Sequence, residues 1–207
     1  MKRDGLFVDI SFTSLPSGDQ CTPDPTDPSP RKIVRLCNTH LESLVSVPPI
    51  RPVQLKVASQ YMHGASSGGS TYNKIGEEEA VVLPTPHAAL LAGDLNAFAP
   101  EDGTAPTECG LQDVFLKLGG QEGTEEAFTW GQQVPLYIKK KFGCSRMDKV
   151  LFCGGIEPLR LQKIGEGVKA WVQYPEQSDE DSTDSTDDGE EVWATDHIGL
   201  CAELQIL

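Results

Sequence analysis

The stretch Ala88-Ala89-Leu90-Leu91-Ala92-Gly93-Asp94-Leu95-Asn96 gives the clearest indication of the fold. Its first five residues are apolar on both faces and end abruptly at a glycine, which is typical of a buried strand in an α/β protein. Asp94 and Asn96 then lie on one face of the strand terminus, where α/β folds place their binding groups. A carboxylate there can orient or deprotonate a water, and an amide can hold a phosphoryl oxygen, as phosphodiester hydrolysis requires. The open alternative is an ordinary turn formed by the Asp and the Asn.

Strand and helix patterns continue on both sides of this stretch. Apolar residues at helical spacing between Ile50 and Met62 predict an amphipathic helix, and Gly64 supplies its stop. Alternation from Ile198 to Leu207 predicts a half-buried terminal strand. The other expected elements are strands at Leu6–Phe12, Ile33–Leu41, Val81–Leu83 and Lys149–Cys153, a short helix at Leu111–Leu118, and an edge or turn at Phe128–Gly131.

Length and composition predict one domain over residues 1–207. A chain of 207 residues that is 38% hydrophobic suits a single core. We expect disordered insertions at about 14–30, 64–79 and 176–191, because these stretches are rich in Gly, Ser, Pro or acids. No apolar stretch approaches the roughly 20 residues of a membrane-spanning helix, so we expect a soluble intracellular protein without a membrane partner. The oligomeric state does not follow from the sequence.

The charge is unevenly distributed along the chain. A formal net charge of −14 argues at first sight against a nucleic-acid partner, because phosphate backbones demand a basic surface. However, residues 176–191 hold nine acids and no base, and the remainder has 22 acids against 17 bases, a net charge of −5. Basic residues gather at Lys139–Lys141, Arg146 and Lys149, where they could meet a polyanion. A solvated loop explains the same residues equally well.

The six cysteines show neither CxxC pairs nor the spacing of a zinc site. We expect free thiols in a reducing compartment, with disulfides as the minor alternative.

A second polar face lies on the strand expected at Ile33–Leu41. Asn38, His40 and Glu42 stand at i, i+2 and i+4, so a regular strand would project all three to one side. A solvent-exposed strand edge explains this pattern nearly as well.

Two further polar positions flank predicted strands near the carboxyl end. Asp196 and His197 can line one pocket only if they lie in the loop before the terminal strand, since adjacent strand residues face opposite ways. Asp148 opens another strand, and its carboxylate could bind the imidazole of His197 and fix its tautomer and charge. A surface ion pair is the alternative for Asp148.

Together these residues resemble, in the same order, the successive motifs of endonuclease/exonuclease/phosphatase enzymes. The motifs are Asn38-Thr39-His40-Leu41-Glu42-Ser43, Gly93-Asp94-Leu95-Asn96, Thr129-Trp130, Arg146-Met147-Asp148-Lys149-Val150 and Asp196-His197. With Arg51 and Gln54-Leu55 added, the spacing is most similar to the 5′-tyrosyl-DNA phosphodiesterases of DNA repair. The resemblance covers the chain apart from the insertions. It implies an α/β (α+β), DNase I-like fold, a two-sheet sandwich flanked by helices with its pocket at the strand ends.

The resemblance also implies a phosphodiesterase that acts on DNA ends or tyrosyl-DNA adducts, in the nucleus. Asp94 would position or activate the attacking water, while Asn96 and His40 would hold the phosphate. His197, oriented by Asp148, would stabilise the charged pentavalent phosphorus.

The implied cofactor is Mg²⁺, with Mn²⁺ as the alternative, acting as a Lewis acid on a phosphoryl oxygen. Asp196 would lie close to the metal. Trp130 would line the nucleic-acid or adduct channel, since aromatic faces stack on bases. Asn38 and Arg146 complete the expected substrate-binding residues.

The chain departs from the family pattern at its start. Family members begin with a strand carrying an Asn and another carrying a metal-ligating Glu, and neither motif occurs before Arg31. We therefore expect the C-terminal part of the domain, with the fold incomplete at the N-terminus. A fragment of a larger enzyme is the favoured explanation, and a shortened protein that has lost its principal metal ligand is the other.

Two other functions stay open. One is an inositol-phosphate or sphingolipid phosphodiesterase of the same superfamily. The other is a non-catalytic remnant that acts as a binding module, for example through the acidic residues 176–191.

Overall fold

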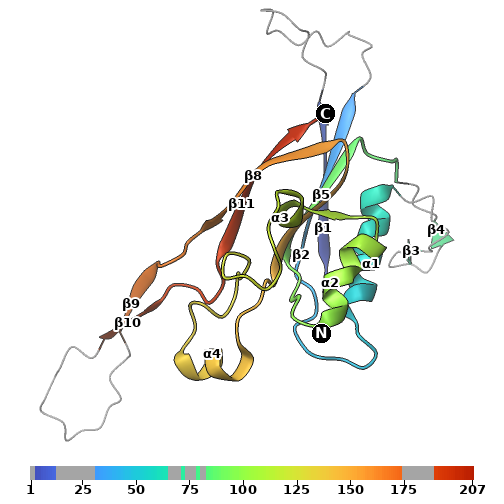
Figure 1. The fold of residues 1–207 in the computed structure, drawn as a ribbon. Coiled ribbons are helices and arrows are strands. Elements are labelled where there is room, and N and C mark those ends of the chain that lie inside the picture. Colours follow the sequence, from blue (N-terminus) through green and yellow to red (C-terminus); the bar gives the residue numbers. More distant parts are fainter. Residues whose placement is uncertain (1–2, 13–30, 65–70, 73–77, 80–82, 174–188) are drawn as a thin grey trace, which may run out of the picture.

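The computed structural model describes residues 3–12, 31–64, 71–72, 78–79, 83–173 and 189–207 (Figure 1). The strands are β1 (Gly5–Phe12), β2 (Lys32–Thr39), β3 (Thr71–Tyr72), β4 (Glu78–Glu79), β5 (Ala88–Asp94), β6 (Gln112–Asp113), β7 (Asp148–Gly154), β8 (Ile156–Ile164), β9 (Lys169–Gln173), β10 (Gly189–Trp193) and β11 (Gly199–Ile206). The helices are α1 (Arg51–His63), α2 (Pro100–Glu108), α3 (Val114–Lys117) and α4 (Leu136–Phe142).

A five-stranded mixed sheet, in the order β1-β2-β5-β7-β6, forms the centre of the protein. β2 and β5 are parallel, so their carboxyl ends meet at one edge of the sheet and bring His40 close to Asp94. β7 is antiparallel to β5, and its first residue, Asp148, pairs with Asp94. The sheet order therefore gathers three polar residues that are far apart in the sequence.

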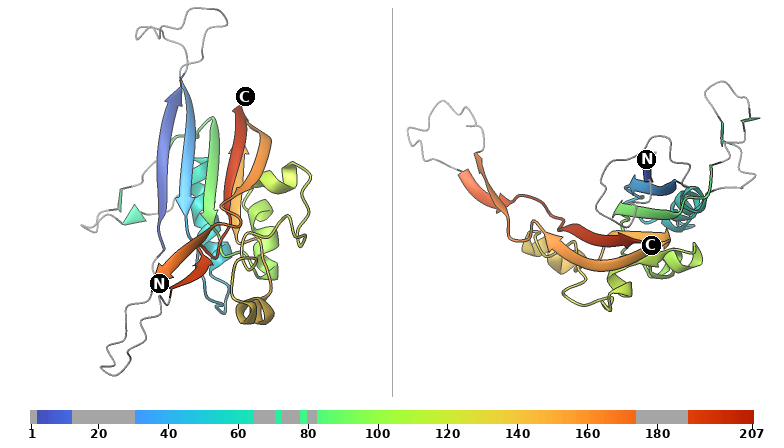
Figure 2. Two further views of the ribbon diagram at one scale, coloured as in Figure 1. Left: turned by 90° about the vertical axis from the view of Figure 1, so that its left-hand side faces the viewer. Right: turned by 90° about the horizontal axis from the view of Figure 1, so that it is seen from above.

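Helices α1 and α2 cover one face of this sheet (Figure 2). Leu55, Ala58 and Met62 recur at helical spacing on α1 and are buried, in one apolar cluster with Leu91 of β5. Gly64 ends the helix as the sequence predicts, since its positive φ of 77° suits glycine.

A buried ion pair joins the two helices beside the edge where the polar residues gather. The Nε of Arg51 donates to both carboxylate oxygens of Asp102 at 3.0 Å. Its Nη1 donates to the main-chain oxygens of Glu42 and Leu44 at 3.3 and 3.2 Å. Arg51 thus fixes the loop that follows His40.

The antiparallel pair β8–β11 packs against the other face of the sheet, over β5 and β7 rather than β1 (Figure 2). Leu200, Ala202 and Leu204 of β11 pack on this core, while Cys201 and Glu203 between them are exposed. The alternation predicted for the terminal strand is therefore confirmed.

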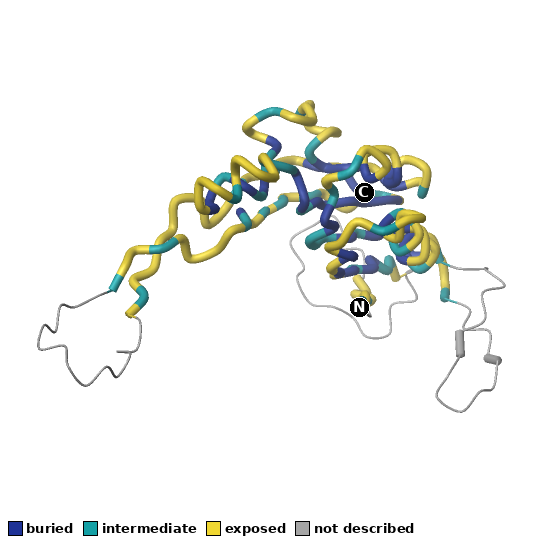
Figure 3. Tube along the Cα trace, turned by 90° about the horizontal axis from the view of Figure 1, so that it is seen from below, coloured by how far each residue is buried: buried dark blue, intermediate teal, exposed yellow. Residues whose placement is uncertain are grey.

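The pair β9–β10 extends away from the body as a narrow two-stranded arm (Figures 1 and 2). Figure 3 shows that the arm is mostly exposed, whereas the buried residues concentrate where the layers meet. The side chain of Trp171 on the arm is 60% exposed. The arm leads directly into residues 194–198, which precede β11.

Sequence patterns correctly predicted β1, β2, β5, β7, β11 and α1. The helix expected at Leu111–Leu118 forms only over Val114–Lys117, as α3, because Gln112–Asp113 pair with β7 as β6. The patterns gave no signal for α2, α4 or β8–β10. Of the three expected insertions, 14–30 lies outside the described residues. In the insertion expected at 64–79, the described residues are Gly64 and the strands β3 and β4. In the one expected at 176–191, they are residues 189–191, which belong to β10. Leu83, the described residue of the strand expected at Val81–Leu83, is in no strand.

The five cysteines within the described ranges are free thiols, and Cys21 lies outside those ranges. Among the described helices, none has the length and apolar character needed to cross a membrane.

Candidate active site

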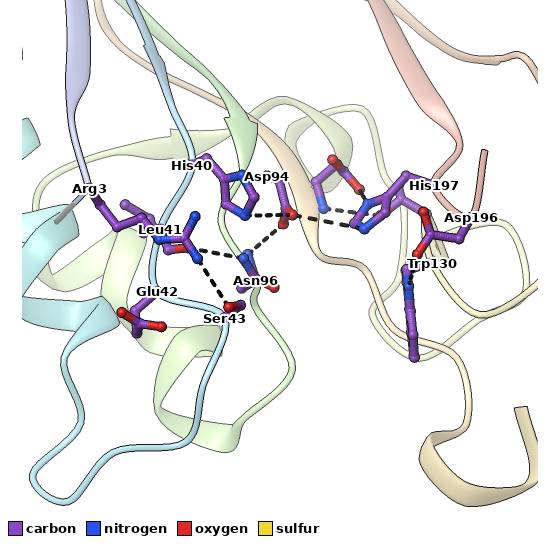
Figure 4. Close-up of polar contacts among 12 residues, drawn as sticks. Arg3, His40, Leu41, Glu42, Ser43, Asp94, Asn96, Trp130, Asp196 and His197 are labelled. Carbon is purple, nitrogen blue, oxygen red and sulfur yellow. Dashed lines mark hydrogen bonds and ion pairs between the residues drawn. The ribbon is translucent and has the colours of Figure 1, made fainter. Parts of the chain in front are cut away.

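The carboxylate of Asp94 lies between two imidazoles at the edge of the sheet (Figure 4). Its Oδ2 is 3.3 Å from Nε2 of His40, which follows β2, and 3.8 Å from Nε2 of His197, which precedes β11. Asp94 is 18% exposed and His40 is 55% exposed, so the cluster opens to solvent. A small polar molecule can therefore reach the point where these groups meet.

His197 is held by Asp148 on its far side. Its Nδ1 lies 2.8 Å from Oδ2 of Asp148, which leaves Nε2 turned toward Asp94. The hydrogen bond to Asp148 raises the pKa of His197 above its usual value, against the effect of burial, and the charges of Asp148, Asp94 and Asp196 act in the same direction. The imidazolium form therefore persists to higher pH than in an isolated histidine.

Main-chain contacts fix the loops that carry these groups. Leu41 N donates to Asp94 O at 2.9 Å, and Leu95 N donates to the oxygen of Met147 at 2.9 Å. At Gly93 the strands approach so closely that a Cβ would lie 1.9 Å from the main-chain oxygen of Thr39. Only glycine fits at this point of contact, which explains the residue before Asp94.

Asn96 forms hydrogen bonds with both of these loops. It has a positive φ of 47°, which asparagine tolerates, and it is 6% exposed. Its main-chain N–H donates to Oδ1 of Asp94 at 2.8 Å, and its Nδ2 donates to the oxygen of Leu41 at 3.0 Å. The amide nitrogen expected near the phosphate thus joins the Asp94 loop to the His40 loop.

Thr129 is a buried residue that joins the two halves of the site, and its motif gave no indication of this role. Its Oγ1 accepts from the main-chain N–H of Asp148 at 3.0 Å, and its main-chain oxygen accepts from Ile198 N at 2.7 Å. Thr129 is 1% exposed. It therefore sets the position of Asp148 relative to His197, a role that depends on contacts between distant segments.

Trp130 and Asp196 lie beside His197. The indole Nε1 of Trp130 donates to Oδ2 of Asp196 at 3.1 Å, and the backbone of Trp130 bridges to His197. Asp196 is exposed. Both residues thus reach the rim of the site, with Asp196 held by Trp130.

The face expected from Asn38, His40 and Glu42 does not form as a unit, because β2 ends at Thr39 and the strand alternation stops there. Asn38 is exposed and donates through Nδ2 to the oxygen of Ala92 at 3.0 Å. Glu42 is 6% exposed, and its Oε1 accepts from Leu44 N at 3.1 Å. Of these three side chains, His40 contacts Asp94.

The structure does not bring Arg146 to this cluster. Arg146 is buried and pairs with Asp113 at 2.8 Å and with Glu122. Lys149 is also buried, 3.1 Å from Glu122. The basic group expected from the sequence is therefore divided, since Lys139–Lys141 are exposed on α4.

Asp94, Asp148 and His197 could hold a metal ion. Each offers one ligand atom, and these atoms all lie within 4.8 Å of one another. Carboxylate oxygens suit Mg²⁺ and Mn²⁺, so the two aspartates fit such a cation, whereas an imidazole nitrogen is a ligand more typical of Zn²⁺. Within the described ranges, Asp196 is not part of this group.

No protein-family model and no curated protein matches the sequence. Among solved structures, the endonuclease/exonuclease/phosphatase from Beutenbergia cavernae DSM 12333 superposes with a TM-score of 0.51 and 14% identity, over 100% of this chain and 40% of that chain. The chain has an endonuclease/exonuclease/phosphatase fold. This confirms the α/β fold class expected from the sequence.

Two other solved structures are similar to the chain. D. rerio TDP2 complexed with single strand DNA product has a TM-score of 0.47 and 18% identity, over 97% of this chain and 68% of that one. Humanized D. rerio TDP2 has a TM-score of 0.41 and 21% identity, over 65% and 47%. The chain thus spans less than half the length of two of these three proteins.

Proposed function

We propose that this protein hydrolyses phosphodiester bonds by direct attack of water on phosphorus. The observation that carries the proposal is the convergence of Asp94, His40, His197 and Asp148 around one solvent-accessible point. A carboxylate beside two imidazoles, one of them held by a second carboxylate, is what general-base catalysis and charge stabilisation need.

Each residue has a distinct role in this reaction. Asp94 accepts a proton from the attacking water, whose oxygen forms the new bond to phosphorus. The ester P–O bond breaks, and the leaving oxygen departs with the electron pair and is protonated by solvent. His197, kept protonated by Asp148, stabilises the negative charge that builds up on the phosphoryl oxygens, and His40 binds one of those oxygens.

A divalent cation is part of the proposal, and Mg²⁺ or Mn²⁺ suits the two carboxylates. Asp94 would hold it, with Asp196 close by, so that Asp148 stays paired with His197. The bound cation would supply Lewis-acid polarisation of the phosphoryl oxygen.

We further propose that the substrate is a DNA end, including ends that carry a tyrosyl adduct. Helix α4 presents the exposed run Lys139–Lys141 near the rim of the site, together with exposed Tyr137. Phe142 of the same helix meets Trp130 edge-on, with ring centroids 6.4 Å apart. Positive charge beside exposed aromatic rings favours a single-stranded nucleic acid, since bases stack on aromatic faces.

The decisive experiment measures hydrolysis of a 5′-tyrosyl oligonucleotide with Mg²⁺ or Mn²⁺. We expect turnover by the wild type and a loss of at least about 100-fold in Asp94→Asn and His197→Gln. Glu203→Gln removes one exposed carboxylate of β11 and is the matched control. Equal turnover in all four proteins would refute the mechanism.

Parallel assays separate the remaining functions. Turnover of inositol phosphates or sphingolipids in vesicles, with none on DNA, would overturn the substrate but keep the reaction. A folded chain that hydrolyses none of these substrates and binds no Mg²⁺ in a calorimetric titration would instead support a binding module.

A further inference from the structure

The candidate site is rich in negative charge, although its proposed substrate is an anion. Asp94, Asp148 and Asp196 all act on His197. The arginine expected among the substrate-binding residues, Arg146, is occupied by Asp113 and Glu122. A phosphate that enters this cluster would therefore gain from a further cationic side chain beside the imidazolium of His197 and the proposed divalent cation.

The pairing of β1 with β2 brings Arg3 to the edge of this cluster. Strand β1 pairs with β2 in a register that sets Gly5 opposite Thr39, and Thr39 Oγ1 donates to the oxygen of Asp4 at 3.1 Å. The residue before Asp4 therefore lies beside the loop that begins at His40. Figure 4 shows the guanidinium of Arg3 next to His40, Asn96 and Ser43, on the side of Asp94 opposite His197.

Arg3 is less tightly paired than the buried arginines of the described chain, although, after a main-chain hydrogen bond, its charge contributes to lowering the pKa of the Glu42 carboxyl. Arg35, Arg51 and Arg146 each pair with a carboxylate. Arg3 donates through Nη2 to the neutral hydroxyl of Ser43 at 3.0 Å. Its Nε is buried and has no hydrogen-bond partner among the described residues. A buried donor without an acceptor costs free energy that an incoming anion can recover by drawing the side chain onto itself.

We propose that Arg3 is a substrate-binding residue of the proposed reaction and that its guanidinium binds a non-bridging oxygen of the phosphate held beside His40. A guanidinium suits this task because two of its N–H groups can donate in parallel to two phosphate oxygens. Ser43 holds the side chain at the site until the phosphate arrives. The proposal rests on the proposed function for the identity of the ligand.

The test measures equilibrium binding of a short oligonucleotide with a 5′-phosphate, and of the same oligonucleotide with a 5′-hydroxyl. All proteins carry Asp94→Asn, so that no turnover occurs. We expect Arg3→Gln to weaken binding of the 5′-phosphate form about 10- to 100-fold, with little effect on the 5′-hydroxyl form. Arg3→Lys keeps the charge but loses the paired N–H donors of the guanidinium, so its affinity for the 5′-phosphate form should lie between those of the parent protein and Arg3→Gln.

Arg160→Gln is the matched control, because Arg160 is an exposed arginine on β8. Equal affinity in Arg3→Gln and its parent would overturn the proposal. So would an equal loss in Arg160→Gln, or an equal loss for both oligonucleotides, since either would reflect net charge alone. If Arg3→Gln fails to fold, Arg3→Lys decides, and an unchanged affinity in that variant refutes the role of the paired donors.

Failure of this inference and failure of the proposed function are distinguishable. If the wild-type protein hydrolyses no phosphodiester, the proposed reaction is refuted, but the preference for a 5′-phosphate and its loss in Arg3→Gln would still establish the binding site. If the wild type hydrolyses its substrate and Arg3→Gln leaves KM and phosphate binding unchanged, the reaction stands and the role of Arg3 is refuted.

Discussion

Two clusters of ionisable side chains lie on opposite faces of β7, and they differ in burial and in charge balance. Lys149 belongs to a cluster with Arg146, Asp113 and Glu122, in which two cations face two carboxylates. Its neighbour Asp148 belongs to the candidate site, in which Asp94 and Asp148 flank the imidazole of His197 and His40 contacts Asp94. Adjacent strand residues point to opposite sides, so one step along the chain separates the two clusters.

The difference indicates which cluster is structural. Arg146, Lys149 and Asp113 are 4–5% exposed, and their charges are neutralised within the protein. Asp94, Asp148 and His197 are 18–28% exposed, and their excess negative charge is left for a cation or for a protonated histidine to balance. Ionisable residues that already satisfy one another stabilise the fold, whereas an unbalanced and accessible group can act on a ligand.

The largest effect is expected from breaking the balanced cluster with Arg146→Met. This change leaves the buried carboxylate of Asp113 and the half-exposed carboxylate of Glu122 with Lys149 as their remaining cation in this cluster, and should lower the free energy of unfolding by about 3–5 kcal/mol. Urea denaturation measures it, and exposed Arg160→Met should change stability by less than about 0.5 kcal/mol. Unchanged stability with a loss of activity per folded molecule would assign Arg146 to the substrate instead.

The same cluster should also respond to acid. Although burial raises it, the hydrogen bond from Arg146 and the charge of Lys149 lower the pKa of Glu122 to about 2. A lowered pKa contributes stability that is present above the ordinary value of about 4.5 and is lost as the pH falls toward 2. Glu122→Gln should flatten this acid limb of the stability curve, and an unaltered limb would contradict the assignment.

A somewhat smaller effect is expected at the unbalanced cluster from Asp148→Asn. The imidazole of His197 loses its anionic partner, so activity should fall about 10- to 100-fold. Because the pKa of His197 is raised by Asp148, activity that depends on the imidazolium is lost as pH rises through that pKa, and Asp148→Asn should move this alkaline limb to lower pH. The pH dependence of kcat/KM tests this, with Glu203→Gln as control. An alkaline limb that stays in place would separate Asp148 from His197.

The next effect concerns the residue that joins the two halves of the site. Thr129→Val keeps the shape of the side chain but removes the acceptor for Asp148 N, and should lower the free energy of unfolding by about 1–2 kcal/mol. Thr129→Ser retains the hydroxyl and should recover most of the loss. Equal stability of the two variants would show that the hydroxyl does not hold Asp148.

The smallest effect is expected at the rim. Changing Lys139, Lys140 and Lys141 to Gln should weaken binding of a single-stranded oligonucleotide. The slope of the logarithm of the binding constant against the logarithm of salt concentration should become less steep by about 0.7 per lost phosphate contact. Stability should stay within about 0.5 kcal/mol, because all three side chains are exposed. An unchanged salt dependence would remove α4 from the nucleic-acid surface.

The elements that the sequence predicts are those whose pattern lies within a single segment. The apolar run before Gly93, the helical spacing after Ile50 and the alternation after Ile198 each report burial within one segment, and the structure confirms all three. The polar residues at strand ends were also visible, because a regular buried strand does not carry them without a reason. Their convergence followed once the strand order was known.

The features that the sequence does not predict depend on contacts between residues that are far apart in the chain. Nothing near Arg146 reveals Asp113 as its partner, so a buried ion pair and a substrate-binding arginine look the same in sequence. Asn96 likewise shows its amide but not the oxygen of Leu41 that receives it. Arg3 gave no signal, since its proximity to Ser43 depends on the pairing of β1 with β2.

The tight contact at Gly93 has a consequence for redesign of the site. Because the oxygen of Thr39 leaves no room for a methyl group there, the separation of the His40 and Asp94 loops is determined by the backbone rather than by the reactive side chains. New chemistry can therefore be installed by exchanging those side chains on an unchanged frame. Alanine at position 93, a far smaller edit, would push the two loops apart and disable every such variant at once.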